Sequence, residues 1–467
     1  MTSSHPPTPR REQRRRRARD LLRALKAGDD RAAARLAARH PRPPDSPRLA
    51  DAQLTIAREH GFPSWPRLRA YVERVAAHGP ELQHAYRDDL DYHDGRAAGL
   101  LASAEDGTQT AVAAFARWGA PLSGSGARLV VAREHGFATW AALRRHVASL
   151  GQSGEPFSRA YRAVEARDLE ALRGELDRFP QLARARGTNG NDLLGMATAT
   201  GDERLVALLL ERGADPASAN AHGWTALHQA AYSGRADLAR TLLEAGARLD
   251  ASARGDGGTP LVVALFWGHQ VPMELVRAFG IHPRNLRAAA GLGLVELIGE
   301  LVAPDGRLAP EAGAHRGFYR PHGGFPAWRP SDDPREILDE AVAWAARCDR
   351  AEAVGALVAR GGDPNADVYR GTPLAWAAAC GRVEAIRRLL ALGADPNGRT
   401  TFGGPDHGEG ATPLHLAAQS CRIEAMETLL EAGADPTARD ARHDGTPADW
   451  AAHDGQGEAE RLLRRRM

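Results

Sequence analysis

A unit of about 33 residues repeats along most of the chain after its first third. One copy, "HGWTALHQAAYSGRADLARTLLEAGARLD", begins at His222. The matching positions Asp192, Thr225 and Thr259 lie 33 and 34 residues apart, and about nine such units can be counted from Phe157 onward. A fixed period of this length is the signature of a repeat protein, in which each unit packs on its neighbours rather than around one central core.

Each unit has the pattern of two short helices joined by a turn. Thr225 is placed to cap the first helix with its hydroxyl, and Gly234 is placed to end that helix in a left-handed conformation. The second helix carries Leu238, Leu242 and Leu243 at helical spacing. Because one such pair cannot bury its own apolar side, the pairs must stack. The predicted fold class is therefore all-α, a helical solenoid.

The repeat resembles the ankyrin repeat, whose consensus includes T-P-L-H-x-A. The segment "ATPLHLAA" (411–418) matches that consensus letter for letter, and the resemblance covers about two thirds of the chain. It implies an ankyrin-repeat α-solenoid in which His228 and His415 tie neighbouring turns together by hydrogen bonds. Three departures stand out: Asp192 replaces the capping threonine, Cys421 replaces the glycine between helices, and the unit at Asn285 is short.

A different repeat precedes this array. "AREHGFPSWPRLRAYV" begins at Ala57 and "AREHGFATWAALRRHV" at Ala132, an offset of 75. We expect a basic disordered tail (1–17), a helical domain of two related halves (18–150), and the repeat array (155–467) with an aromatic-rich insertion at about 306–334. The AREHGF motif resembles one found ahead of ankyrin arrays in bacterial proteins, and it implies no known activity.

Composition favours a soluble, non-catalytic protein. The formal net charge is +2, and the strong preference for arginine over lysine is typical of a GC-rich, bacterial genome. No apolar run is long enough to span a membrane and no secretory signal precedes the helices, so we expect a cytoplasmic protein. Cys348, Cys380 and Cys421 fall in successive units, too far apart to share a zinc ion. We expect no metal, no cofactor, no small-molecule substrate and no catalytic residues.

A nucleic-acid-binding regulator is the alternative function. The segment 57–61 has the spacing of a helix-turn-helix element, and the arginine run at 10–19 could neutralise phosphates. Against this, the second helix mixes Arg67 and Arg69 with Glu73, and arginine runs are commonly solvated tails. The sequence favours protein recognition, with nucleic acid as the less favoured partner.

The resemblance implies partner binding at the turn tips and at the exposed edge of each first helix, along one concave face. Aromatic residues at such positions are informative because tryptophan and tyrosine dominate interface energies. Two alternatives stay open: Phe266 and Trp267 could fill space beside a thin helix, and the insertion could plug the gap left by the short unit. The predicted partner-binding residues are His222, Trp224, Tyr232, Ser233, Phe266, Trp267, Phe318, Tyr319, Arg320, Phe325, Trp328, Tyr369 and Gln419.

Overall fold

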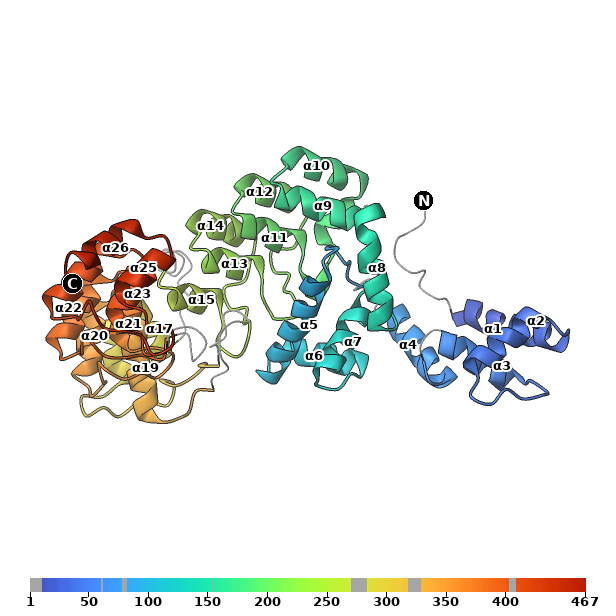
Figure 1. Ribbon diagram of the computed structural model, residues 1–467, viewed down its shortest axis with the longest axis horizontal. Helices are drawn as coiled ribbons and strands as arrows, with labels where there is room; N and C mark the ends of the chain where they lie inside the picture. The colour runs from blue at the N-terminus through green and yellow to red at the C-terminus, as the bar shows by residue number, and fades with distance from the viewer. Residues whose placement is uncertain are drawn as a thin grey trace. The chain divides into compact units, whose positions relative to one another are not determined.

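The structure is a computed structural model in which residues 11–59, 62–77, 82–153, 155–269, 284–317, 329–402 and 409–467 are described. Within these ranges the regular elements are helices, accompanied by a few isolated β-bridges (Figure 1). The expected all-α class is therefore confirmed. The chain divides into two compact units, 1–222 and 223–467, which are treated separately below.

Within the first unit, residues 11–153 form two sets of four helices in the same order, called the first half (11–77) and the second half (82–153). In each half a short helix hairpin is followed by the AREHGF helix and its partner, and α3 and α7 begin 75 residues apart. One hydrogen bond also recurs, because Arg58 donates to the carbonyl of Arg39 while Arg133 donates to the carbonyl of Trp118. The helices are α1 (Arg11–Lys26), α2 (Asp30–Arg39), α3 (Leu49–Glu59), α4 (Trp65–Ala77), α5 (Leu90–Glu105), α6 (Gln109–Trp118), α7 (Gly124–Glu134) and α8 (Trp140–Ser153).

The basic tail is shorter than expected. Helix α1 begins at Arg11, whereas the sequence prediction assigned residues 1–17 to a disordered tail. The stretch 11–17 extends the amphipathic helix that buries Ala18 and Leu21, and arginine is a good helix former. Residues 1–10 lie outside the described residues.

Two repeat units belong to the first compact unit. They comprise α9 (Pro156–Glu165) with α10 (Leu169–Arg178), and α11 (Leu193–Thr200) with α12 (Glu203–Glu211), separated by the 3-10 helices η2 (Pro180–Arg184) and η3 (Thr188–Gly190). Side-chain contacts join them to α5: the Asn189 amide donates to the carbonyl of Arg96 at 3.1 Å, and Ser103 hydrogen-bonds His222 at 2.7 Å. The compact division thus falls after these hairpins, beyond the boundary that the sequence predicts near residue 150.

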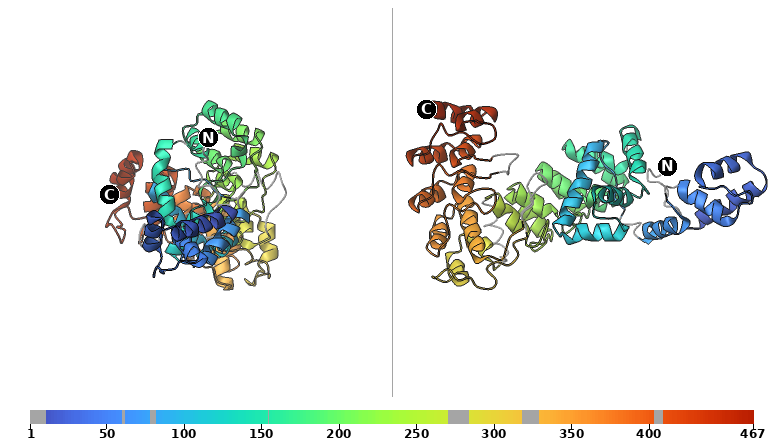
Figure 2. Two further views of the ribbon diagram at one scale, coloured as in Figure 1. Left: turned by 90° about the vertical axis from the view of Figure 1, so that its right-hand side faces the viewer. Right: turned by 60° about the horizontal axis from the view of Figure 1, so that its bottom comes forward.

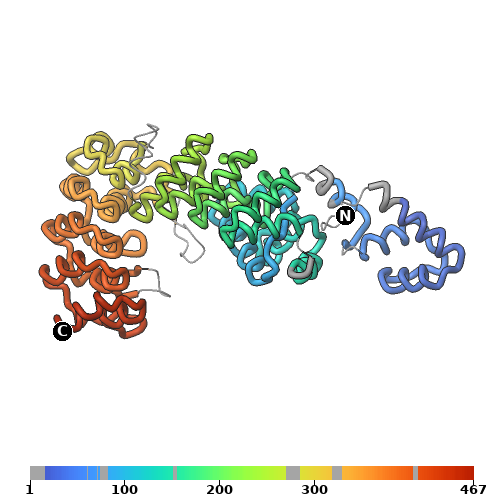
Figure 3. The backbone as a smooth tube through the Cα atoms, turned by 90° about the horizontal axis from the view of Figure 1, so that it is seen from above, coloured from blue at the N-terminus to red at the C-terminus, as the bar shows by residue number. Residues whose placement is uncertain are grey.

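The second unit is a stack of helix hairpins, visible as successive layers from green to red in Figures 2 and 3. From α17 onward the first helices contact one another in a row, and the second helices from α18 to α24 form a parallel row. The helices are α13 (Ala226–Tyr232), α14 (Ala236–Glu244), α15 (Pro260–Phe266), α17 (Leu286–Leu292), α18 (Val295–Leu301), α19 (Pro334–Arg347), α20 (Ala351–Val358), α21 (Pro373–Cys380), α22 (Val383–Ala391), α23 (Pro413–Gln419), α24 (Ile423–Glu431), α25 (Pro447–His453) and α26 (Gly457–Arg464).

The caps expected from the sequence are present. Thr225 caps α13 through a hydrogen bond from the backbone N–H of His228, and Asp192 caps α11 in the same way. The departure at Cys421 is accommodated with φ +51°, so a cysteine occupies the left-handed position that glycine takes in other units. The sequence pattern therefore predicted the local structure even where single residues differ from the consensus.

The histidines of the repeat tie successive turns together, as the resemblance implies. His228 places Nδ1 2.8 Å from the Thr225 hydroxyl and Nε2 2.9 Å from the carbonyl oxygen of Gly258. His415 repeats this arrangement with the carbonyl of Gly445 at 3.0 Å. Each ring bridges the cap of its own helix and the backbone of the next unit.

Replacing Gly268 with alanine should destabilise the second unit more than the same change at Gly393. Both glycines have positive φ, so either alanine loses about 1 kcal/mol from the left-handed backbone. A Cβ on Gly268 would also lie 2.4 Å from the carbonyl oxygen of Arg347, whereas Gly393 has open space. We expect Gly268→Ala to cost roughly 2 kcal/mol more than Gly393→Ala, measured by urea denaturation. Equal midpoints for the two variants would contradict the close approach of α15 and α19.

Candidate functional site

Three partly exposed rings lie in contact along the first two repeats of the second unit. Trp224 and Tyr232 have ring centroids 6.1 Å apart, and Tyr232 and Trp267 are 5.5 Å apart, both in edge-on geometry. Trp224 precedes α13, Tyr232 ends it, and Trp267 follows α15. We call these three residues the aromatic patch. Edge-to-face contacts of this kind are favourable beyond simple burial, so the rings hold one another in place.

Polar neighbours orient the patch. The Trp224 indole donates to the side-chain oxygen of Gln229 at 3.3 Å, and the Arg254 guanidinium lies 5.7 Å from the Trp224 ring centroid. His269 places Nε2 2.9 Å from the carbonyl oxygen of Tyr232 and so joins α15 to the end of α13. The patch therefore combines partly exposed rings with an adjacent cation.

Beneath the patch lies a buried group of rings around one arginine. Phe266 contacts Trp267, Trp344 and Trp376 at centroid distances of 5.3, 6.0 and 5.7 Å. The buried guanidinium of Arg347 lies 3.7 Å from the Trp376 ring centroid, and it donates to the carbonyl oxygen of Phe266 at 3.0 Å. Three repeats meet at this point, so Trp267 of the patch adjoins a buried, closely packed base.

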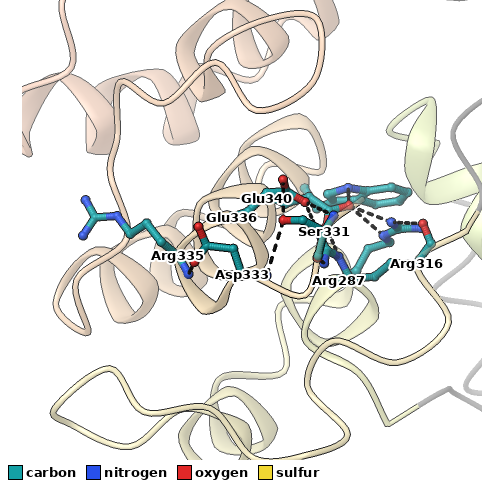
Figure 4. Close-up of polar contacts among 8 residues, drawn as sticks. Arg287, Arg316, Ser331, Asp333, Arg335, Glu336 and Glu340 are labelled. Carbon is teal, nitrogen blue, oxygen red and sulfur yellow. Dashed lines mark hydrogen bonds and ion pairs between the residues drawn. The ribbon is translucent and has the colours of Figure 1, made fainter. Parts of the chain in front are cut away.

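A second buried group consists of charged side chains that pair with one another (Figure 4). Glu340 accepts hydrogen bonds from Arg287 at 2.9 Å and from Arg316 at 2.5 Å. Arg316 also donates to Glu336 at 2.9 Å, and Arg287 donates to the carbonyl oxygen of Arg316 at 2.9 Å. We call Arg287, Arg316, Glu336 and Glu340 the ion cluster. Because its two positive and two negative charges are paired and hydrogen-bonded, it can be buried.

The ion cluster also fastens both sides of the aromatic-rich insertion. Arg316 donates to the carbonyl oxygen of Ser331 at 2.6 Å, and the Ser331 N–H donates to Glu336 at 2.7 Å. Earlier in the insertion, Ala312 is buried and its carbonyl accepts the N–H of Leu286. The described parts of the insertion are therefore packed on the array.

Three predicted partner-binding residues are buried, which corrects the expectation that they are exposed. Phe266 is 0% exposed because the end of α15 lies against α19 and against Trp376 of α21. His222 is 2% exposed and is bonded to Ser103. Tyr369 is 8% exposed and packs in the hydrophobic core of the array. The alternative in which Phe266 fills space beside its helix is the one that the structure supports.

The other predicted residues divide into two groups. Ser233 is exposed next to Tyr232, and Gln419 is half-buried at the end of α23. The predicted residues of the insertion lie outside the described residues; these are Phe318, Tyr319, Arg320, Phe325 and Trp328. Only Trp224, Tyr232, Ser233 and Trp267 are thus both described and gathered at one place.

Several residues of the buried base and of the ion cluster were missed by the sequence analysis. Trp344 and Trp376 occupy the same position in "AVAWAARC" and "PLAWAAAC", four residues before Cys348 and Cys380. This coincidence in two repeats was a usable signal of an aromatic row. Arg287, Arg347 and Glu340 gave no such signal, because a charged residue on a helix is normally exposed.

Cys348 is a buried free thiol that donates to the carbonyl of Leu265, and burial raises the pKa of its thiol to about 12. Within the described residues no group of three histidine, cysteine, aspartate or glutamate side chains is placed to hold a metal ion. In the same part of the chain, every helix is too short or too polar to cross a bilayer.

These features define a helical-hairpin repeat protein with capped, histidine-tied units. The family model described as ankyrin repeats (3 copies) matches residues 168–253, 194–283 and 331–400. The family model of a single ankyrin repeat matches residues 409–441. The chain belongs to the ankyrin-repeat family.

Curated relatives share the repeats over limited lengths. The chain is 32% identical over 95 residues to the Notch-regulated ankyrin repeat-containing protein of Xenopus laevis, a match that covers 20% of this chain and 83% of that protein. It is 35% identical over 127 residues to a protein named as a probable E3 ubiquitin-protein ligase of Oryza sativa, with 27% of this chain and 25% of that protein covered. The chain thus spans about a quarter of the rice protein.

Proposed function

We propose that this chain is a non-catalytic interaction scaffold that binds a protein partner through the aromatic patch of its second unit. The observation that carries the proposal is the contact row Trp224–Tyr232–Trp267, partly exposed and fixed on a buried base. Ankyrin repeats are generally protein-interaction modules, and rigid aromatic rings lose little conformational freedom on binding. The expected site is the concave side of the array, in a cytoplasmic and bacterial setting.

The chemistry of the patch defines the partner. Rings of tryptophan and tyrosine favour an apolar or aromatic side chain of the partner at the centre of the contact. Arg254 stands beside Trp224 and favours a carboxylate next to that apolar group. We therefore expect a protein segment that presents an apolar residue flanked by an acidic one.

Removal of one patch ring should strongly reduce capture of the partner. The full chain and its Tyr232→Ala and Trp267→Ala variants serve as parallel baits in a cell extract, and bound proteins are quantified by mass spectrometry. Loss of a central ring costs about 2 kcal/mol or more at an interface hot spot, so capture should fall by roughly thirtyfold.

Two further variants control for folding. Ser233→Arg adds a bulky charge at an exposed position beside Tyr232 and should also block capture without opening the array. Leu122→Ala removes an exposed leucine of the first unit and should leave capture unchanged. If every captured protein binds the patch variants as well as it binds the original chain, the proposal is wrong.

A further inference from the structure

The two four-helix halves of residues 11–153 differ sharply in net charge. Residues 11–77 hold 17 arginines and lysines but only 8 aspartates and glutamates, whereas residues 82–153 hold 7 of each kind. The helices of the two halves correspond, so this difference lies on a shared framework. The second half forms the same four helices without an excess of positive charge. The fold therefore does not require the excess that the first half carries.

The excess charge is displayed on α1 and α2. Helix α1 buries Ala18 and Leu21, which leaves Arg16, Arg17 and Arg19 exposed to solvent. Arg31 of α2 is exposed as well. We call Arg16, Arg17, Arg19 and Arg31 the basic face. Arg17 and Arg31 line the same groove of about 490 Å³, together with Arg35.

The basic face is not consumed by internal ion pairs. The pairs among described side chains of this half join Arg23 to Asp20, Arg35 to Glu59, Arg69 to Glu73 and His40 to Asp51. None of the four arginines of the basic face has a carboxylate within ion-pair distance among those side chains. Asp20, Asp29 and Glu59 also line the groove, so its positive charge is partly offset. The exposed guanidinium groups remain available to an external anion.

We propose that the basic face of α1 and α2 binds the phosphate backbone of a nucleic-acid duplex. Arginine suits phosphate because its planar guanidinium donates two parallel hydrogen bonds. A protein interface is usually anchored by buried aromatic or apolar side chains, and an amphipathic helix that lies on a membrane inserts apolar groups. Leu49 is the sole large apolar side chain exposed among the described residues of this half. Repeated charge without apolar anchors fits a polyanion best.

We expect this contact to be independent of the base sequence of the duplex. The outward face of α4, the second helix of the AREHGF element, mixes Arg67 and Arg69 with Glu73, and Arg69 is paired with Glu73 at 3.1 Å. That helix is poorly suited to lie against phosphates or to read bases. The basic face on α1 and α2 therefore carries the contact, in contrast to the helix-turn-helix alternative that the sequence suggests.

Duplex binding by the full chain tests this proposal. Fluorescence anisotropy with a labelled 20-base-pair DNA duplex should give an affinity that falls roughly 100-fold between 50 and 200 mM NaCl, as expected for about four neutralised phosphates. Arg17→Glu/Arg31→Glu should weaken binding at least about tenfold at 50 mM NaCl and make the slope of log K against log salt shallower by about 2.

Matched controls distinguish binding by the basic face from a general effect of the net charge of the chain. Arg144→Glu/Arg145→Glu makes the same change of charge at exposed arginines of the second half and should alter affinity less than about twofold. A duplex of unrelated sequence should bind equally well. Circular dichroism checks that both double variants are folded. The proposal is overturned if the original chain does not bind the duplex, if both double variants weaken binding equally, or if phosphatidylserine vesicles bind while the duplex does not.

Discussion

Glu340→Gln is expected to lower the free energy of unfolding of the second unit by about 3–5 kcal/mol, the typical cost of breaking a buried ion pair. Glu340 holds both Arg287 and Arg316, and all three side chains are buried. Glutamine would keep the shape but leave the cluster with an excess positive charge that water cannot reach. Chemical denaturation followed by circular dichroism measures the loss.

Glu300→Gln is the matched control for this prediction. Glu300 pairs with Arg284 at 2.8 Å in the same unit, but both side chains are more than half exposed. Exposed pairs contribute about 0–1 kcal/mol, so this variant should be close to the original chain. If Glu340→Gln costs no more than Glu300→Gln, the ion cluster is not a structural element of the array.

Acid should destabilise the second unit through the histidines that tie its repeats. Burial lowers the pKa of His228 to about 4 from its ordinary value of 6.5. Between these values the unfolded chain binds a proton that the folded chain does not, so stability is lost as pH falls from about 6.5 to about 4. The shift corresponds to about 3 kcal/mol for this group.

His228→Asn isolates this effect. The variant loses the tie to Gly258 and should be less stable at pH 7, yet its stability should change less between pH 7 and pH 5. Burial also lowers the pKa of His415, so the double variant with His415→Asn should be flatter still. Burial raises the pKa of Glu134 in the first unit to about 7, which acts in the opposite direction. For this reason we compare the urea midpoint of each variant with that of the original chain at each pH. If the two midpoints change with pH in parallel, the prediction is wrong.

Most of the local structure could be predicted from the sequence. Thr225 precedes the start of α13 and Gly234 follows its end. Both could be predicted because a hydroxyl cap and a left-handed glycine act within one or two turns of their own helix. The compact division at 222 could not be predicted. It depends on contacts such as Asn189 with Arg96 and His222 with Ser103, which join residues about a hundred positions apart and leave no local pattern.

The candidate site was predicted only in part for a related reason. A strictly periodic array implies that each repeat contacts only the next one, and on that basis Phe266 would be at an exposed edge. Instead Phe266 also meets Trp344 and Trp376 of later repeats, with the Arg347 guanidinium 4.8 Å from its ring centroid. Trp224, Tyr232 and Trp267 are packed against the same core but stay partly exposed.

Hydroxyl-radical footprinting of the full chain, with and without its captured partner, tests the central claim most directly. Partner binding at the aromatic patch predicts that oxidation of Trp224, Tyr232 and Trp267 decreases in the complex, while the half-buried Trp140 of the first unit oxidises as before. Unchanged oxidation of the three patch rings, with protection elsewhere on the chain, would contradict the account.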